Sequence, residues 1–383
     1  MRHIIWVGLL GLITACAAGR AEQGGTRAAA EPSSFATSAV TVMQAYDLDS
    51  RFGDAASLGR FAIERTRLLK DTPGEARLQV ELGRVLSRQL RHEPGVDEAE
   101  VVAILQRARQ LAEASNHPGV LAAALDAEGM YHYFNKLLAG RGEWAPIVAL
   151  FERSAALAEQ AGDSRGLSEA LFHLGLTQQF QGNAVRAREV YERSLAVARG
   201  AGDALMQSYN LRHLAGLAEK RGDLDTALAQ HRECLRLREQ VGFHTGQIFA
   251  LIAVAHVLTL REPQGDEALP TAQRALRMAE ERKDPAATRE SLAMLGRVHL
   301  RRGDGASALP HLEQAMANAE SHQDWLSLVE MLLDSARAHA LRGEKAHVET
   351  QVRRAFSLAT GKGLTVVLGD VEQLGREHGI ALR

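Results

Sequence analysis

Small and apolar residues recur along most of this chain with a period of about 40 residues. Helices of a hairpin approach to about 8–10 Å only where side chains are small, whereas Leu fills the space between hairpins. The pattern therefore predicts stacked helix hairpins. One register of small residues is Ala108, Ser154, Ser194, Cys234, Ala275, Ala315 and Ala355. A second register is Gly83, Gly129, Gly175, Ala215, Ala255, Gly296 and Ala336, with Gln79, Leu125, Leu171, Leu211, Leu251, Leu292 and Leu332 four residues earlier.

Turn residues stand where this pattern needs them. Gly can adopt the left-handed conformation that ends a helix, and a following Asn or Asp can cap the next one. Such pairs separate the two helices of a repeat, and single Asp residues precede the first helices, where we expect N-caps. The pairs are Gly182-Asn183, Gly222-Asp223 and Gly303-Asp304, and the single residues are Asp163, Asp203, Asp284 and Asp324.

Two stretches show the same order of residues at the same intervals. One is Leu174-Gly175, Gly182, Ala187, Tyr191 and Ser194, and the other is Leu295-Gly296, Gly303, Ala308, Leu312 and Ala315. This order resembles the tetratricopeptide repeat (TPR) signature. The resemblance implies an all-α fold, a right-handed superhelical solenoid of antiparallel helix hairpins. The usual repeat has about 34 residues, so these longer repeats are more similar to those of kinesin light chains and bacterial regulators.

The repeat frame divides the chain into segments. We expect a partial repeat over 38–75, seven repeats over 76–363 and a capping helix over 364–383. Extra residues predict enlarged loops near 91–98, 135–144 and 262–264.

The N-terminus has the pattern of an export signal. Basic residues precede an apolar run over 4–15 that is too short to span a bilayer. Its end, Ile13-Thr14-Ala15-Cys16, resembles the lipobox of bacterial lipoproteins. The resemblance implies a signal peptide over 1–15, a lipid on Cys16 and a flexible tether over 16–37. Ala17 favours the outer membrane facing the periplasm, an inference that does not hold in a Gram-positive host.

The charge of the chain and the letters of known motifs argue against several functions. A net charge of −2 over 383 residues provides no field that attracts nucleic acid. His92-Glu93 does not continue into a zinc-protease motif, and the Gly162–Gly166 stretch lacks the strand that a hydrolase elbow needs. Cys234 occupies a small-residue position, which favours a buried side chain. His173 with His213, and His299 with His339, share positions in adjacent repeats but lack carboxylate partners in the frame. We therefore expect no enzyme, cofactor or metal site.

The first helix of a TPR repeat lines the concave groove, where rings and guanidinium groups suit a peptide. The residues expected there are Tyr133, Phe134, Phe172, Phe180, Tyr209, Arg212, Lys220, Phe249, Arg297, Arg301 and Arg337. The alternative is that the rings belong to the core and the Arg side chains are solvated.

These features together predict an envelope-anchored scaffold that binds a protein or peptide of unknown identity. It would meet the membrane through its lipid anchor only and would not bind nucleic acid. The alternative is a regulatory or sensor TPR module that binds a ligand or signalling protein, with the effector on another chain.

Overall fold

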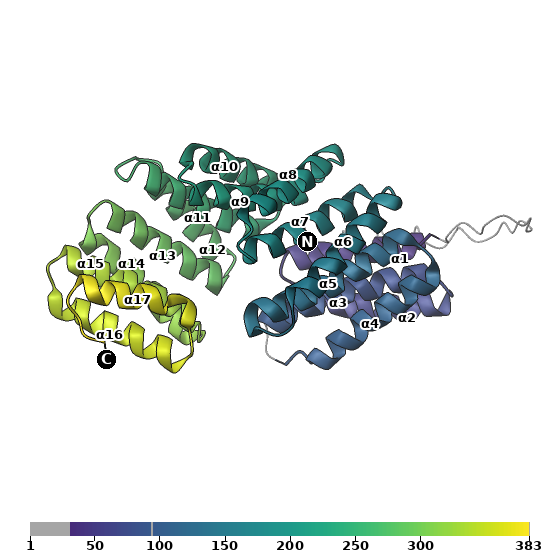
Figure 1. Ribbon diagram of the computed structural model, residues 1–383, viewed down its shortest axis with the longest axis horizontal. Helices are drawn as coiled ribbons and strands as arrows, with labels where there is room; N and C mark the ends of the chain where they lie inside the picture. The colour runs from purple at the N-terminus through teal and green to yellow at the C-terminus, as the bar shows by residue number, and fades with distance from the viewer. Residues whose placement is uncertain (1–30, 93–94, 383) are drawn as a thin grey trace, which may run out of the picture. The chain divides into compact units, whose positions relative to one another are not determined.

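The computed structural model describes residues 31–92 and 95–382, and these residues form helices α1 to α17 with no strand among them (Figure 1). The expected signal peptide and Cys16 lie outside the described residues. The helices are α1 (Ser34–Leu48), α2 (Phe52–Leu68), α3 (Thr72–His92), α4 (Glu98–Ser115), α5 (Pro118–Ala139), α6 (Trp144–Gln160), α7 (Ser164–Phe180), α8 (Ala184–Gly200), α9 (Ala204–Lys220), α10 (Leu224–Gln240), α11 (His244–Arg261), α12 (Ala268–Glu281), α13 (Pro285–Arg301), α14 (Gly305–Ser321), α15 (Trp325–Leu341), α16 (Lys345–Gly361) and α17 (Thr365–Glu377).

The chain divides into two compact units between Ala201 and Gly202. The N-terminal unit holds α1 to α8, and the C-terminal unit holds α9 to α17. In each unit an odd-numbered helix packs on the even-numbered helix that follows it, which gives successive hairpins. Odd-numbered helices also contact one another, as α3 does with α5 and α13 does with α15. We refer to them as the first-helix layer of their unit.

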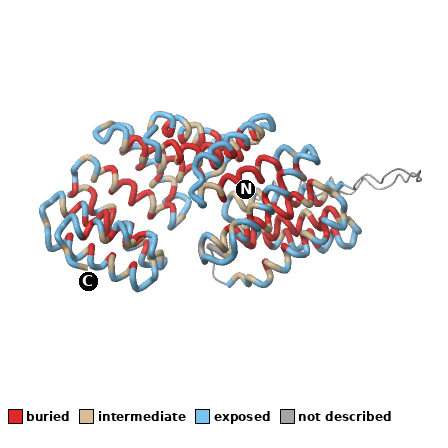
Figure 2. The backbone as a smooth tube through the Cα atoms, in the orientation of Figure 1, coloured by how far each residue is buried: buried red, intermediate tan, exposed pale blue. Residues whose placement is uncertain are grey.

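The small-residue registers form the centre of each unit, as the sequence predicts. All seven positions of the first register are buried, as is the row of Leu residues with Gln79. Figure 2 shows buried residues where neighbouring helices face one another. Two positions carry Ser in place of Ala, and their hydroxyls are satisfied across the hairpin. Ser154 Oγ donates to the Ala122 carbonyl at 2.8 Å, and Ser194 Oγ donates to the Ser168 carbonyl at 2.6 Å.

The predicted turn chemistry is confirmed at most positions. Gly182, Gly222 and Gly303 have φ values of 84°, 76° and 77°. The Asp residues expected before the first helices accept hydrogen bonds from the backbone of the first turn. These are Asp163 from Gly166, Asp203 from Met206, Asp284 from Ala287 and Asp324 from Ser327. Asn183 precedes α8 without making such a bond.

The extra residues near 91–98 lie mostly in the connection between α3, which ends at His92, and α4, which begins at Glu98, as expected. The loop expected at 135–144 needs correction, because most of these residues lengthen α5, which has 22 residues and continues to Ala139. Continuing a helix satisfies backbone groups that a long loop would leave open. The extra residues at 262–264 do lie in a connection, between α11 and α12.

The ends of the described fold are helical. The first helix begins at Ser34 rather than near position 38, because the Ser33 side chain caps it and the Ser33 amide donates to Asp71. The last helix, α17, packs on α15 and α16 through buried residues that include Leu374. No helix in the described part of the chain is long and apolar enough to cross a membrane.

Candidate binding surfaces of the two units

The C-terminal unit has a hollow of about 770 Å³ across its first-helix layer. It is open to solvent and mixes cations with apolar side chains, among them Leu341, which is 52% exposed. The lining residues are His256, Thr259 and Leu260 from α11, Met294, Arg297, Leu300 and Arg301 from α13, Asp334, Arg337, Ala340 and Leu341 from α15, Leu374 and Glu377 from α17, and His378. We call this hollow the α11–α17 groove.

The charges of the α11–α17 groove are arranged around one buried carboxylate. Asp334 accepts from Arg297 Nε at 2.7 Å through one oxygen and from Arg337 Nη1 at 2.8 Å through the other. Burial, the largest single influence, lowers the pKa of Arg297, but Asp334 together with Glu330 and Glu290 outweighs burial, so that the pKa of Arg297 is raised. Arg301 makes no hydrogen bond or ion pair with the described residues, and its side chain is exposed. The groove thus presents a cation that is free for an incoming anion.

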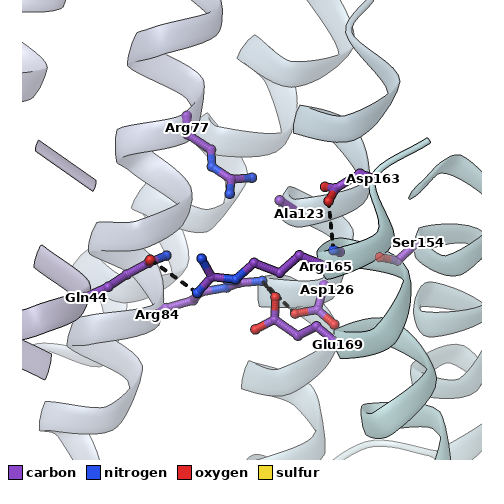
Figure 3. A pocket seen from close by; sticks show the side chains of 10 residues that line it. Gln44, Arg77, Arg84, Ala123, Asp126, Ser154, Asp163, Arg165 and Glu169 are labelled. Atoms are coloured by element: carbon purple, nitrogen blue, oxygen red, sulfur yellow. Dashed lines mark hydrogen bonds and ion pairs between the residues drawn. The ribbon is translucent and has the colours of Figure 1, made fainter. Parts of the chain in front are cut away.

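The N-terminal unit has a much smaller cavity at its own first-helix layer. Figure 3 shows side chains from α1, α3, α5 and α7 pointing into it. Its volume of about 20 Å³ suits roughly one water molecule. Arg165 Nη2 donates to Gln44 Oε1 at 3.3 Å across it. This cavity is too small for a peptide, so within the two first-helix layers the α11–α17 groove is the better candidate.

A buried charge network lies beside that cavity. Arg84 Nη2 donates to Asp126 Oδ2 at 2.7 Å and to Glu169 Oε2 at 3.1 Å (Figure 3). His173 Nδ1 lies 2.6 Å from the other oxygen of Asp126. Burial alone would raise the pKa of Glu169, but the positive groups around it, Arg84 first and then His173, Arg165 and Arg77, together hold that pKa well below its ordinary value.

Ligand atoms of Asp126, Glu169 and His173 lie within 4.8 Å of one another, which is the spacing of a metal site. The Arg84 guanidinium already neutralises both carboxylates, however, and would repel a cation. We therefore interpret the cluster as structural.

Two of the residues expected in a groove are core residues instead. Tyr133 is 2% exposed and Phe172 is 6% exposed, so placing them in a groove was wrong. A first helix contacts both its hairpin partner and the next first helix, which buries positions that the frame places at the surface. Tyr133 packs edge-on against Phe134 and Phe180, with ring centroids 5.2 and 5.8 Å away. Phe134 is half-buried, whereas Phe180 is 49% exposed.

The other expected groove residues fall into two groups. Arg297, Arg301 and Arg337 lie together in the α11–α17 groove. Tyr209, Arg212, Lys220 and Phe249 belong to the same unit but do not line that hollow. Tyr209 is half-buried and packs against Phe243 at 6.1 Å. Phe249 is also half-buried, and Arg212 and Lys220 are exposed. An aromatic patch running from Phe180 to Phe249 stays a prediction, because Phe180 belongs to the N-terminal unit.

Cys234 is fully buried, which agrees with its small-residue position. Burial is the main cause of a raised pKa for its thiol, which disfavours the reactive thiolate.

The histidine pairing differs from the sequence expectation. His299 stacks on His311 and His339 stacks on His347, so each partner is on the second helix of the same hairpin. His339 also has the carboxylate partner that the sequence analysis missed, namely Glu344 at 2.6 Å. The sequence signal for this contact was the spacing of three residues. Glu344 follows His339 by five residues and precedes His347 by three, across the turn that joins α15 to α16.

Comparisons with known proteins identify the fold. No family model matches the sequence, and no curated protein matches it. A Rap protein complexed with Competence and Sporulation Factor is similar in structure, with 14% identity, 86% of this chain and 99% of that chain covered, and a TM-score of 0.56. The apo form of RapI has 12% identity, coverage of 90% and 97%, and a TM-score of 0.56. A signal transduction ATPase with a tetratricopeptide repeat sensor, from Pyrococcus horikoshii, has 13% identity, coverage of 77% and 43%, and a TM-score of 0.54. The fold is a TPR-like arrangement of helical repeats.

Proposed function

We propose that this protein is a binding scaffold that holds an acidic, partly apolar peptide or protein segment in the α11–α17 groove. The observation that carries the proposal is that one groove is lined both by the exposed Arg301 guanidinium, which makes no ion pair with the described residues, and by the exposed Leu341 side chain. An acidic residue of the partner would pair with Arg301, while an apolar neighbour would cover Leu341. No chemical turnover is part of this function.

The buried Asp334 supports the proposal by fixing the shape of the groove. Its two oxygens hold Arg297 and Arg337, which come from neighbouring first helices. A partner would thus meet side chains that are already ordered, and less conformational entropy would be lost on binding. The fold also supports binding by analogy, because the similar Rap protein was solved in complex with Competence and Sporulation Factor.

The test is an array of 12-residue peptides in which Leu alternates with Glu, with Lys or with Ser, probed with the full chain at low and physiological salt. We expect the Glu-Leu peptides to be retained, most strongly at low salt. Arg301→Ala should weaken that retention by about three- to tenfold. Arg277→Ala is the matched control, because Arg277 is an exposed arginine on α12 that does not line the groove.

Two results would count against the groove. Equal retention of all three peptide classes would remove the charge argument, and equal losses for both arginine variants would show a general charge effect rather than a site. Circular dichroism of each variant confirms that the helices are intact.

A second candidate function is a sensor module whose effector is another protein. The observation in its favour is that the similar repeat array from Pyrococcus horikoshii is the sensor of a signal transduction ATPase. A regulated kinase, ATPase or phosphatase that co-purifies with the chain and changes its activity on groove occupancy would favour this function over a passive scaffold.

We further propose that the scaffold is lipid-anchored in a bacterial cell envelope through Cys16, at the outer membrane facing the periplasm. The support is the lipobox-like sequence over 13–16. Cys16→Ser should abolish acylation and move the protein from the membrane to the soluble fraction, because a lipid chain supplies the membrane affinity. Unchanged sedimentation of the Cys16→Ser protein with membranes would refute the anchor.

A further inference from the structure

The turn between α15 and α16 differs from the corresponding turns of the α9–α10 and α13–α14 hairpins. Asp223 and Asp304 stand at the N-caps of α10 and α14, and each accepts a hydrogen bond from the backbone of the first turn. Glu344 stands at the corresponding position of α16 and makes no capping bond. Its carboxylate, 28% exposed, is directed instead to the side chains of His339 and Arg342.

Two imidazole rings and this carboxylate converge at the turn. His339 Nδ1 lies 2.6 Å from Glu344 Oε2, and the His347 ring stacks on the His339 ring with centroids 4.7 Å apart. One ligand atom from each of the three residues lies within 4.8 Å of the other two. His339 is largely buried whereas His347 is exposed, so the cluster opens to solvent on the His347 side.

We propose that His339, Glu344 and His347 bind a divalent transition-metal ion of the zinc type. Imidazole nitrogens with one carboxylate oxygen are ligands that such ions prefer, and three protein ligands leave a position for water or for a ligand from a partner. The ion would replace the hydrogen bond between His339 Nδ1 and Glu344 Oε2, and the proton of that bond would be released to solvent. This site does not depend on the proposed peptide binding.

Arg342 does not compete with a metal ion for the ligand oxygen of Glu344. Its Nε and Nη2 atoms both lie 2.7 Å from Glu344 Oε1, whereas the histidine is on Oε2. Oε2 is therefore the oxygen that would bind the ion. Arg342, on Oε1, would hold the carboxylate in place from outside the coordination shell. The cluster differs from that at Asp126 in its exposure to solvent. The side chains of Arg342 and Glu344 are 42% and 28% exposed, so water screens the Arg342 charge, whereas those of Arg84 and Asp126 are 14% and 3% exposed and Arg84 also pairs with Glu169.

The preceding hairpin offers an internal comparison. His299 and Asp304 occupy the positions of His339 and Glu344, but Asp304 is used as a helix cap and lies 3.9 Å from His299. Ser307 stands where the later hairpin has His347. The repeat therefore does not require these three ligands, and their presence at one hairpin is a specific feature of that hairpin.

The test is a titration of the full chain, free of any affinity tag, with Zn²⁺ by isothermal titration calorimetry and with Co²⁺ by visible absorption. We expect Co²⁺ to give the visible bands of a low-coordinate site and Zn²⁺ to displace it. His347→Ser recreates the residue of the preceding hairpin and should weaken Zn²⁺ binding at least about tenfold, as Glu344→Gln should. His311→Ser, which removes the other stacked second-helix histidine, is the matched control and should leave binding unchanged.

Each other outcome overturns the proposal. No uptake of Zn²⁺ by the unsubstituted chain, full affinity in the His347→Ser protein, or the same loss in the His311→Ser protein would show that these three residues do not form the site. The exposed position of His347 in the first turn of α16 lets the variant fold, which circular dichroism checks.

Discussion

The ring of Tyr191 fills the space that a Cβ atom on Gly175 would need. Such an atom would lie 2.5 Å from Cε1 of the ring, and the Tyr191 side chain is fully buried. The same relationship joins Gly129 to Phe151, at 2.7 Å. The glycines of the first helices thus let a large residue of the second helix reach the helix backbone, which brings the two helices of a hairpin together.

Gly175→Ala should therefore destabilise the protein even though Ala is the better helix former. The gain in helix propensity is about 1 kcal/mol, whereas overpacking a rigid buried ring costs about 1–3 kcal/mol. We expect a lower midpoint of urea unfolding.

Gly216→Ala is the matched control, because Gly216 is also inside a first helix but has no atom within 4 Å of a Cβ position. It should gain about 0.5–1 kcal/mol. Stabilisation by both substitutions would mean that the Tyr191 ring moves aside at little cost.

The sequence predicted the hairpins well because their determinants are local or periodic. Small residues such as Ala315 and caps such as Asp284 recur at fixed intervals, and each acts within one hairpin. The exposure of Tyr133 and Phe172 could not be predicted in this way, since it depends on how closely the next first helix approaches. The division of the chain between Ala201 and Gly202 could not be predicted either, because the repeat spacing does not change there.

The candidate sites were predicted only in part, for a related reason. Arg297, Arg301 and Arg337 recur on first helices, so their register brought them into one groove. Asp334 holds two of these arginines, but the repeat pattern does not distinguish a buried acidic residue such as Asp334 from an exposed one. Glu344 was missed because it stands at a capping position, where a carboxylate is normally interpreted as a helix cap.

Removal of Arg84 should be among the most damaging single changes in the N-terminal unit. Arg84→Ala would leave Asp126, whose side chain is 3% exposed, next to Glu169 without its cation. An uncompensated buried charge costs about 3–5 kcal/mol. We expect a loss of that size in the free energy of unfolding at pH 7.

The control for that variant is Arg186→Ala, which breaks an exposed pair with Glu189. The two side chains of that pair are 63% and 51% exposed, so the loss should be below about 1 kcal/mol. Similar losses for the two arginines would show that the network around Asp126 is well hydrated and contributes little.

The thiol of Cys234 should be unreactive in the folded protein. Its side chain is fully buried and burial raises its pKa, so little thiolate is available to attack a reagent. In the Cys16→Ser protein, where Cys234 is the one remaining thiol, we expect no reaction with Ellman's reagent until urea unfolds the chain. Cys234→Ala should change stability by less than about 1 kcal/mol, since Ala fills the same position in other repeats. Rapid labelling of the native protein would require a reactive thiol and would contradict this assignment.

His213 should make the protein less stable in mild acid. Burial, followed by the charges of Arg212 and Arg238, lowers the pKa of this histidine to about 3 in the fold. An unfolded chain has a histidine pKa near 6.5. Below about pH 6.5 the unfolded state therefore binds a proton that the folded state does not, and the free energy of unfolding falls as the pH falls.

The size of this effect is bounded by the difference in proton binding. A fully coupled histidine changes the free energy of unfolding by about 1.4 kcal/mol per pH unit, and the half-buried His213 side chain should contribute less. Urea unfolding of the unsubstituted chain and of His213→Gln at pH 7.5, 6.5, 5.5 and 5.0 isolates the contribution, since every other titrating group is common to both. Above pH 6.5 the difference between the two proteins should be constant, and below it the unsubstituted chain should lose stability faster. Parallel curves across the whole range would mean that His213 takes up its proton equally in the folded and unfolded states, so that burial does not keep it neutral.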